Sequence, residues 1–151
     1  HYLQKADSTE SAFFFCDMEH IEHIGIAVRD LEQSILVYER LLNTKCYKRE
    51  EVASENVITA FFKAGNNKIE LLQATSEASA IHSFIEKRGE GIHHIAYIVK
   101  NIESEMVRLK SEGFRLLNAF PKKGADNKLI CFVHPKDASG VLTELCQEVS
   151  K

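Results

Sequence analysis

The sequence lacks long apolar runs, basic blocks and closely spaced cysteines, and each absence excludes a class of protein. Apolar runs such as Ala12 to Cys16 are far shorter than the roughly 20 residues that span a bilayer, so no membrane partner is expected. The 19 basic and 22 acidic side chains give a net charge of −3 without a basic cluster. A nucleic-acid partner is therefore not expected either.

The four cysteines occur without a Cys-x-x-Cys pair, each in an apolar or strand-like context. This pattern predicts buried, reduced thiols rather than a disulfide framework or a zinc knot, and it favours a cytoplasmic location. The 151 residues suffice for one compact domain. Because the sequence starts at His1 and Met18 is suited to be the natural initiator, we expect residues 1–18 to form an N-terminal extension outside the fold.

An internal repeat is the most informative feature that the sequence does contain. Residues 22–32, which read EHIGIAVRDLE, return as residues 93–103, which read HHIAYIVKNIE. A second element repeats as well, because KIELLQ at 68–73 is echoed by LTELCQ at 142–147. The chain therefore consists of two related modules, each too small to be stable alone.

Each module carries one histidine and, later, one glutamate at equivalent positions. His23 precedes Glu70 by 47 positions, and His94 precedes Glu144 by 50. Two imidazoles and two carboxylates are a common ligand set for a divalent metal. The repeat therefore predicts a metal site on a pseudo-twofold axis between the modules.

Both copies of the repeat predict a strand followed by a capped helix. Small or polar residues alternate with bulky apolar ones over 23–28, so one face of this strand should line a cavity and the other should pack under a helix. Asp30 and Asn101 are placed to cap helices over 31–42 and 102–109.

The remaining pattern completes two similar modules. Further strands are expected over 46–51, 57–63, 68–73, 114–117, 128–133 and 141–146, with a linker helix over 80–87. This predicts an α+β fold of two βαβββ modules, whose curled mixed sheets surround a shared metal-binding cleft. The expected boundaries are the extension at 1–18, the first module at 19–79, the linker helix at 80–90 and the second module at 91–151.

The candidate ligands follow from the repeat. Adjacent His93 and His94 should leave their strand on opposite faces, and alignment with His23 selects His94. A lone His or Glu on a strand is usually only hydrogen-bonded or partly exposed. Glu70 and Glu144, however, lie within apolar strands, where an unpaired carboxylate is costly unless it meets a cation. A shared divalent ion satisfies both, and cobalt, zinc, nickel, manganese and iron all suit the set.

Several sequence blocks resemble one known family. They are residues 23–32, 67–72, 86–96 and 134–145. Together they are similar to the methylmalonyl-CoA epimerases, a family of the vicinal oxygen chelate superfamily, and the block at 86–96 is the most specific of them.

The resemblance implies the fold of that superfamily, a divalent metal cofactor and a coenzyme A thioester as substrate. It makes His23, His94 and Glu144 metal ligands, with Glu70 in the position of a fourth ligand. We also expect a homodimer. One departure concerns Thr59, which stands where part of the family carries a carboxylate proposed as a second acid/base.

The implied activity is that of an isomerase, a metal-dependent epimerase that interconverts the C2 epimers of methylmalonyl-CoA. The reaction would proceed by proton abstraction and return through a metal-stabilised enolate. Glu144 is the preferred acid/base and Glu70 the pseudo-symmetric candidate for its partner. Glu50 and Glu51, at a strand end, are more typical of solvated charges.

Cations at the cleft mouth would suit the phosphates of coenzyme A. Lys122, Lys123 and Lys136 are available there, although exposed lysines usually only add solubility.

Three alternative functions are compatible with the same fold, and the first two of them use the same kind of metal site. They are a glyoxalase-like isomerase acting on a glutathione hemithioacetal, an extradiol-type dioxygenase that holds iron through two histidines and one carboxylate, and a non-catalytic small-molecule-binding module. Four convergent ligands argue against the last, because a purely binding cleft does not need them.

Overall fold

The computed structural model describes residues 18–150, which form one mixed sheet flanked by helices. The first half comprises β1 (Met18–Ala27), α2 (Leu31–Leu42), β2 (Lys48–Val52), β3 (Val57–Ala64) and β4 (Asn67–Ala74). After α3 (Ala80–Arg88), the second half comprises β5 (Gly91–Val99), α4 (Ile102–Ser111), β6 (Lys122–Lys123), β7 (Lys128–Val133) and β8 (Thr143–Glu148). The expectation for residues 1–17 lies outside the described residues, and β1 starts at Met18.

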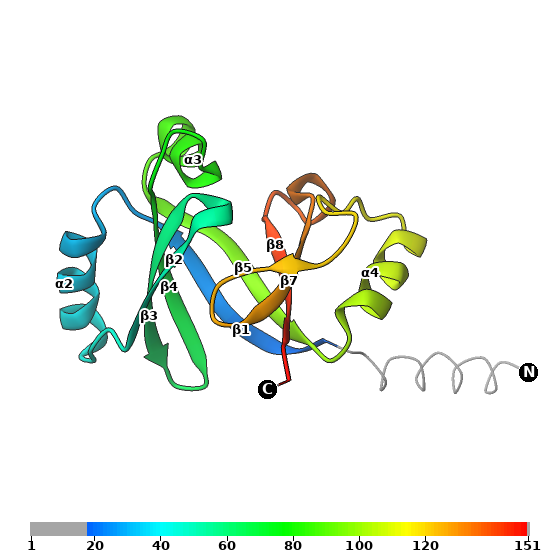
Figure 1. Cartoon of the computed structure of the whole chain (residues 1–151), viewed down its shortest axis with the longest axis horizontal. Coiled ribbons are helices and arrows are strands. Elements are labelled where there is room, and N and C mark those ends of the chain that lie inside the picture. The colour runs from blue at the N-terminus through cyan, green and yellow to red at the C-terminus, as the bar shows by residue number, and fades with distance from the viewer. Residues whose placement is uncertain (1–17, 151) are drawn as a thin grey trace, which may run out of the picture.

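The eight strands follow the order β2-β3-β4-β1-β5-β8-β7-β6, so each half of the chain supplies one half of the sheet. Within each half, the first strand is parallel to the last, and β1 pairs antiparallel with β5 where the halves meet. Figure 1 shows the sheet curling between α2 at one side and α4 at the other. The expected α+β class with curled mixed sheets is confirmed.

The two peripheral helices bury equivalent apolar faces against the sheet. Leu31 and Ile35 of α2 join a buried cluster with β3 and β4, and Ile102 and Met106 of α4 join one with β7 and β8. Each fully buried side chain of this size contributes roughly 1.5–3 kcal/mol relative to an exposed one. Because strand side chains alternate, the opposite face of both half-sheets is left free for the site.

The beginnings of α2 and α4 are held in the same way. Asp30 and Asn101 cap them, and each side-chain oxygen accepts a hydrogen bond from the backbone N–H three residues later, at 3.2 and 3.0 Å. Gln73 and Gln147 accept the first N–H of the same helices at 2.6 and 2.7 Å. These contacts explain why Asp or Asn, and then Gln, recur in both modules.

The strand pairing between β1 and β5 contains three irregularities, and two of them match between the modules. Glu22 on β1 and His93 on β5 are each passed over in the pairing register, so each is the extra residue of a β-bulge. Both bulged residues stand directly before a candidate ligand histidine.

The strand expected over 114–117 is not formed. Leu116 makes a single bridge to Val133, and the edge of the sheet is instead the short β6. Asn118 gives the physical reason, because its side-chain oxygen accepts the Phe132 N–H at 3.0 Å and so replaces a backbone bond of the ladder.

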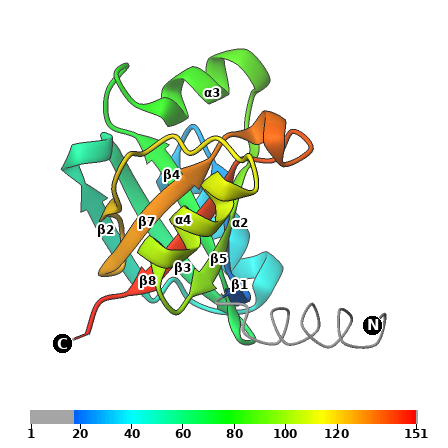
Figure 2. The ribbon, with the colours of Figure 1, turned by 90° about the vertical axis from the view of Figure 1, so that its right-hand side faces the viewer.

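Helix α3, which connects the halves, covers one end of the sheet. Ile81 and Ile85 pack against Ala27, Val57 and Leu72, and Figure 2 shows the helix lying across that end. Among the described residues, none of the helices combines the length and apolar character needed to cross a membrane.

Candidate functional site

A cavity of about 270 Å³ lies on the inner face of the sheet, between its two halves. Thr59, Phe61 and Leu72 line it from the first half, and Ile130 and Phe132 from the second. An apolar wall thus surrounds the polar side chains that project into the cavity, which lowers the local dielectric and strengthens their electrostatic interactions.

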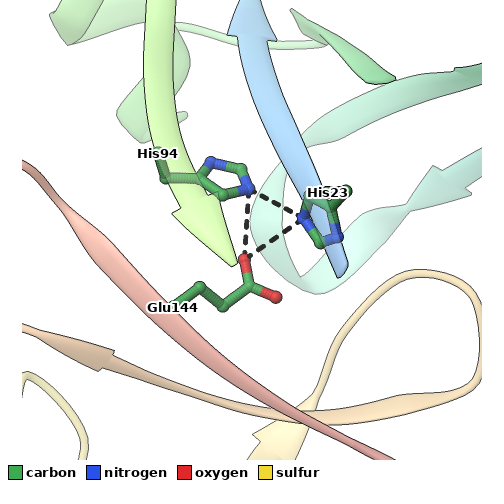
Figure 3. Close-up of side chains that lie close together, drawn as sticks. All are labelled: His23, His94 and Glu144. Atoms are coloured by element: carbon green, nitrogen blue, oxygen red, sulfur yellow. Dashed lines mark hydrogen bonds and ion pairs between the residues drawn. The ribbon is translucent and has the colours of Figure 1, made fainter. Parts of the chain in front are cut away.

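The four side chains predicted as ligands meet in this cavity, and none of the residues is more than 6 % exposed. His23 Nε2 lies 3.0 Å from His94 Nε2 and 2.9 Å from Glu70 Oε2, while His94 Nε2 lies 3.2 Å from Glu144 Oε2. The cross-module distances are 3.8 Å from His23 Nε2 to Glu144 Oε2 and 3.6 Å from His94 Nε2 to Glu70 Oε2. Figure 3 shows His23, His94 and Glu144 pointing at one another from β1, β5 and β8.

The register of the sheet explains this convergence. The residue two positions after each histidine pairs with the glutamate of the same module, which gives Gly25 with Glu70 and Ala96 with Glu144. Across the join between the halves, each of these residues also pairs with the histidine of the other module. The two histidines and the two glutamates are therefore related by the pseudo-twofold axis that the repeat predicted.

Gly25 provides the space for one of the two imidazoles. A Cβ built at this position would overlap the His94 ring and lie within 2.6 Å of its Nε2. Gly25, in the first copy of the repeat, is therefore required because the His94 side chain of the second copy approaches its backbone closely.

The structure corrects the expectation that His93 faces away from the cavity. His93 lines the cavity beside His94, and its Nδ1 lies 2.9 Å from His94 Nδ1. The β-bulge is the reason, because the extra residue breaks the strict alternation of side chains along β5. Glu22 follows the same rule, since it lines the cavity beside His23 and its Oε1 lies 3.6 Å from His23 Nδ1.

A network of charges joins Glu22 to the second half of the chain. Lys68 Nζ donates to Glu22 Oε1 at 3.0 Å and to Asp126 Oδ2 at 2.9 Å. Asp126 also accepts from Lys48 Nζ at 2.8 Å, and its backbone N–H donates to Glu50 Oε2 at 2.6 Å. The loop between β6 and β7 is therefore anchored to β2 and β4 beside the cavity.

Burial and neighbouring charges separate the pKa values of these groups. Burial lowers the pKa of His23, but the Glu22 and Glu70 carboxylates outweigh it and raise this pKa to about 10. Burial raises the pKa of Glu70, but hydrogen bonds to His23 and His94 outweigh it and lower this pKa to about 2. For Glu144, burial dominates and raises the pKa. Perturbed and opposed pKa values of this kind are typical of functional sites.

The donor set fits a divalent ion. Ligand atoms that share an ion at about 2.1 Å lie roughly 3.0–3.4 Å apart, and the five distances given above run from 2.9 to 3.8 Å. His23, His94 and Glu144 each offer one donor atom, all within 4.8 Å of one another. Glu70 contacts both imidazoles and is the candidate for a fourth ligand.

The remaining acid/base candidates and the lysines expected at the cleft mouth differ in burial and in their hydrogen-bond partners. Thr59 is fully buried in the cavity wall, and its hydroxyl donates to the Glu50 carbonyl at 3.3 Å. Glu50 binds the loop between β6 and β7, and Glu51 is exposed. Lys122 lines the cavity and pairs with Glu55 at 2.6 Å, whereas Lys123 and Lys136 are exposed.

Glu22, His93, Lys68 and Asp126 were missed as parts of the site in the sequence analysis. A signal existed for the first two, because they occupy the same position in the two repeats, directly before the ligand histidine. The contacts of Lys68 with Asp126 join residues from different modules, and no pattern in the sequence indicates them.

Comparison with known proteins relates the chain to one superfamily. Residues 22–132 match the family described as the Glyoxalase/Bleomycin resistance protein/Dioxygenase superfamily. The ethylmalonyl-CoA/methylmalonyl-CoA epimerase of Cereibacter sphaeroides is 40 % identical over 84 % of this chain and 96 % of that protein. The methylmalonyl-CoA epimerase of Homo sapiens is 36 % identical over 87 % and 75 % of the two chains.

Solved structures agree with these relatives. The crystal structure of methylmalonyl-CoA epimerase from Mycobacterium tuberculosis has a TM-score of 0.86 and 33 % identity, covering 90 % of this chain and 92 % of that one. A structure of methylmalonyl-CoA epimerase in complex with methylmalonyl-CoA has a TM-score of 0.84 and 32 % identity, covering 88 % and 96 %. The vicinal oxygen chelate fold expected from the resemblance is thereby confirmed.

Replacing Gly25 with alanine should weaken ion binding while leaving the sheet intact. The new methyl group would displace the His94 ring, and loss of ligand support of this kind reduces metal affinity on the order of 10–100-fold. Titration of the metal-free variant with Co²⁺ measures the change. Ala96→Gly, at the pseudo-equivalent position, adds no atom and serves as the control; equal affinity in wild type and Gly25→Ala would contradict the prediction.

Ion binding at pH 7 should release about one proton from His23. Its pKa of about 10 in the metal-free protein means that Nε2 or Nδ1 carries an extra proton at neutral pH, which a ligand nitrogen must lose. Raising the pH towards 10 removes this competing proton, so the apparent affinity should rise over that range. Calorimetry in two buffers of different ionisation enthalpy measures the proton count, and an affinity independent of pH between 7 and 9 would reject the argument.

Proposed function

Because the chain belongs to the Glyoxalase/Bleomycin resistance protein/Dioxygenase superfamily, in its methylmalonyl-CoA epimerase branch, we propose that it interconverts the two C2 epimers of methylmalonyl-CoA. The chain is accordingly an isomerase. A coenzyme A thioester is its proposed substrate, as in the relative whose structure contains methylmalonyl-CoA.

One observation carries the proposal above all. Two glutamates from opposite modules, Glu70 and Glu144, reach the same pair of imidazoles inside an apolar cavity. Epimerisation requires one group that removes a proton from a carbon and another that returns a proton on the opposite side. Carboxylates on β4 and β8 approach the shared point from two sides and supply such a pair.

The environments of the two glutamates suit opposite roles. In the metal-free site the lowered pKa of Glu70 keeps it ionised, as a base requires, and the raised pKa of Glu144 makes it the more easily protonated of the two. The roles exchange when the reaction runs in the other direction, so Glu144 is also the base of the reverse step. Thr59 carries no acid or base at the position where part of the family has a carboxylate, which leaves Glu70 as the partner of Glu144.

His23, His94, Glu144 and Glu70 would hold a divalent metal at this point. A bound divalent ion supplies Lewis-acid stabilisation of the negative charge that develops on an oxygen. The chain itself contributes the apolar wall that excludes water, and the β-sheet register that fixes all four side chains relative to one another. The expected homodimer and cytoplasmic location stay predictions.

Deuterium from heavy water should enter C2 of methylmalonyl-CoA when one epimer is incubated with the metal-loaded protein. Proton removal and return would also racemise the substrate, and a chelator should stop both processes. Mass spectrometry and chiral analysis measure them. Absence of exchange, together with formation of lactoylglutathione from methylglyoxal and glutathione, would instead favour the glyoxalase-like isomerase.

Substitution of Glu144 by glutamine should reduce turnover by roughly 10²–10⁴-fold, the range typical of a lost general acid or base. The amide keeps the size of the side chain and an oxygen that can still face an ion. Turnover and metal content are measured together, so that loss of metal can be separated from loss of proton transfer. Glu148→Gln, on the exposed end of the same strand, is the matched control; near-normal turnover in Glu144→Gln would refute the assigned role.

A further inference from the structure

Each candidate ligand histidine directly follows the extra residue of a β-bulge, and that residue faces the outer nitrogen of the imidazole. We propose that Glu22 and His93 are positioning residues, which keep a proton on Nδ1 of His23 and of His94, so that Nε2 of each ring is the nitrogen that binds the ion. The proposal rests on the metal-dependent function proposed above and assigns residues that the proposed reaction does not otherwise use.

The His23 side of the site lacks a hydrogen bond where one is needed. Nδ1 of His23 is buried and has no hydrogen-bond partner among the described side chains. The nearest charged group is the Glu22 carboxylate, whose Oε1 lies 3.6 Å away, a few tenths of an ångström beyond hydrogen-bond length. A fixed negative charge opposite Nδ1 favours an N–H at that nitrogen and leaves Nε2 to bind an ion.

Glu22 is itself held in place by its neighbours. Its side chain is 9 % exposed, and Oε1 accepts from Lys68 Nζ at 3.0 Å. Lys68 in turn binds Asp126 on the loop of the second module. The carboxylate therefore cannot turn away from His23 without breaking its ion pair with Lys68.

The His94 side uses a neutral group in the same position. The Nδ1 atoms of His93 and His94 are 2.9 Å apart, so one of them carries the shared hydrogen. If His94 donates, its Nε2 keeps an electron pair facing Glu144 and His23. If His93 donates, the His94 hydrogen moves to Nε2 and blocks the site. The edge-on packing of the His93 ring against Phe84 of α3, at 5.0 Å between centroids, keeps His93 in this place.

The two sides share one arrangement but differ in charge. A carboxylate opposite His23 makes that imidazole a stronger donor than the neutral ring opposite His94 does. The bulge matters for both, because a regular strand would send residues 22 and 93 to the face away from their histidines.

This assignment can be tested with variants that remove the group opposite Nδ1. Glu22→Leu and His93→Phe keep the side-chain volume roughly constant, and each should weaken Co²⁺ binding on the order of 10–100-fold. Glu22→Gln keeps an acceptor oxygen but loses the negative charge, so its affinity should lie between those of wild type and Glu22→Leu. Glu19→Leu is the matched control, because Glu19 is also passed over in the β1–β5 register but is exposed and far along the strand from His23. Equal affinity in Glu22→Leu and the control would overturn the role of Glu22, and wild-type affinity in His93→Phe would overturn that of His93.

A spectroscopic measurement on the wild-type protein tests the tautomers themselves, even where a variant fails to fold. Long-range ¹⁵N–¹H spectra of the zinc-loaded protein should place the protons of His23 and His94 on Nδ1 and the ion on Nε2. An ion on Nδ1, or no zinc binding, would overturn the proposal. Neither measurement uses substrate. If the protein epimerises methylmalonyl-CoA but its histidines have other tautomers, only the positioning role is refuted. If the histidines have the expected tautomers but the protein does not epimerise methylmalonyl-CoA, only the proposed substrate is refuted.

Discussion

The antiparallel pairing of β1 with β5 is the constraint on which the site depends. It is the join between two half-sheets, and it sets His23 opposite Ala96 and His94 opposite Gly25. A shift of one residue in this register would turn every side chain of one strand to the other face. The buried clusters under α2 and α4 prevent that shift, because each half-sheet already has one face committed to a helix.

The same pairing brings together charges that neither module could bury alone. Glu70 and Glu144 each lie among apolar residues, and an isolated carboxylate there would be strongly destabilising. Each has a histidine of its own module within 3.2 Å and the histidine of the other module within 3.8 Å. The same contacts therefore serve both stability and the proposed chemistry. The histidines and glutamates that pair with one another in the metal-free protein are also the side chains that would bind an ion.

The two modules are not identical, and the differences are concentrated at the site. Gly25 corresponds to Ala96, and the absence of a Cβ at Gly25 makes room for the His94 imidazole of the other module. Glu22 corresponds to His93, so one outer nitrogen faces a charge and the other a neutral ring. Glu70 and Glu144 correspond to each other but differ in the direction of their pKa shifts. A reaction that uses one acid and one base needs two different environments, and these differences provide them at equivalent positions of a duplicated scaffold.

The sequence by itself determined the duplication, the order of most elements and the four convergent side chains. These follow from local signals: alternation along 23–28, the caps Asp30 and Asn101, and the spacing of His and Glu in both copies. Only the tertiary structure decided that the half-sheets form one continuous sheet, that the strand expected over 114–117 is absent, and that His93 faces the cavity. The physical reason is that these features depend on the partner strand. A β-bulge is defined by the pairing of two strands, and Asn118 replaces a backbone hydrogen bond between strands, whereas the periodicity of one segment carries no information about its partner.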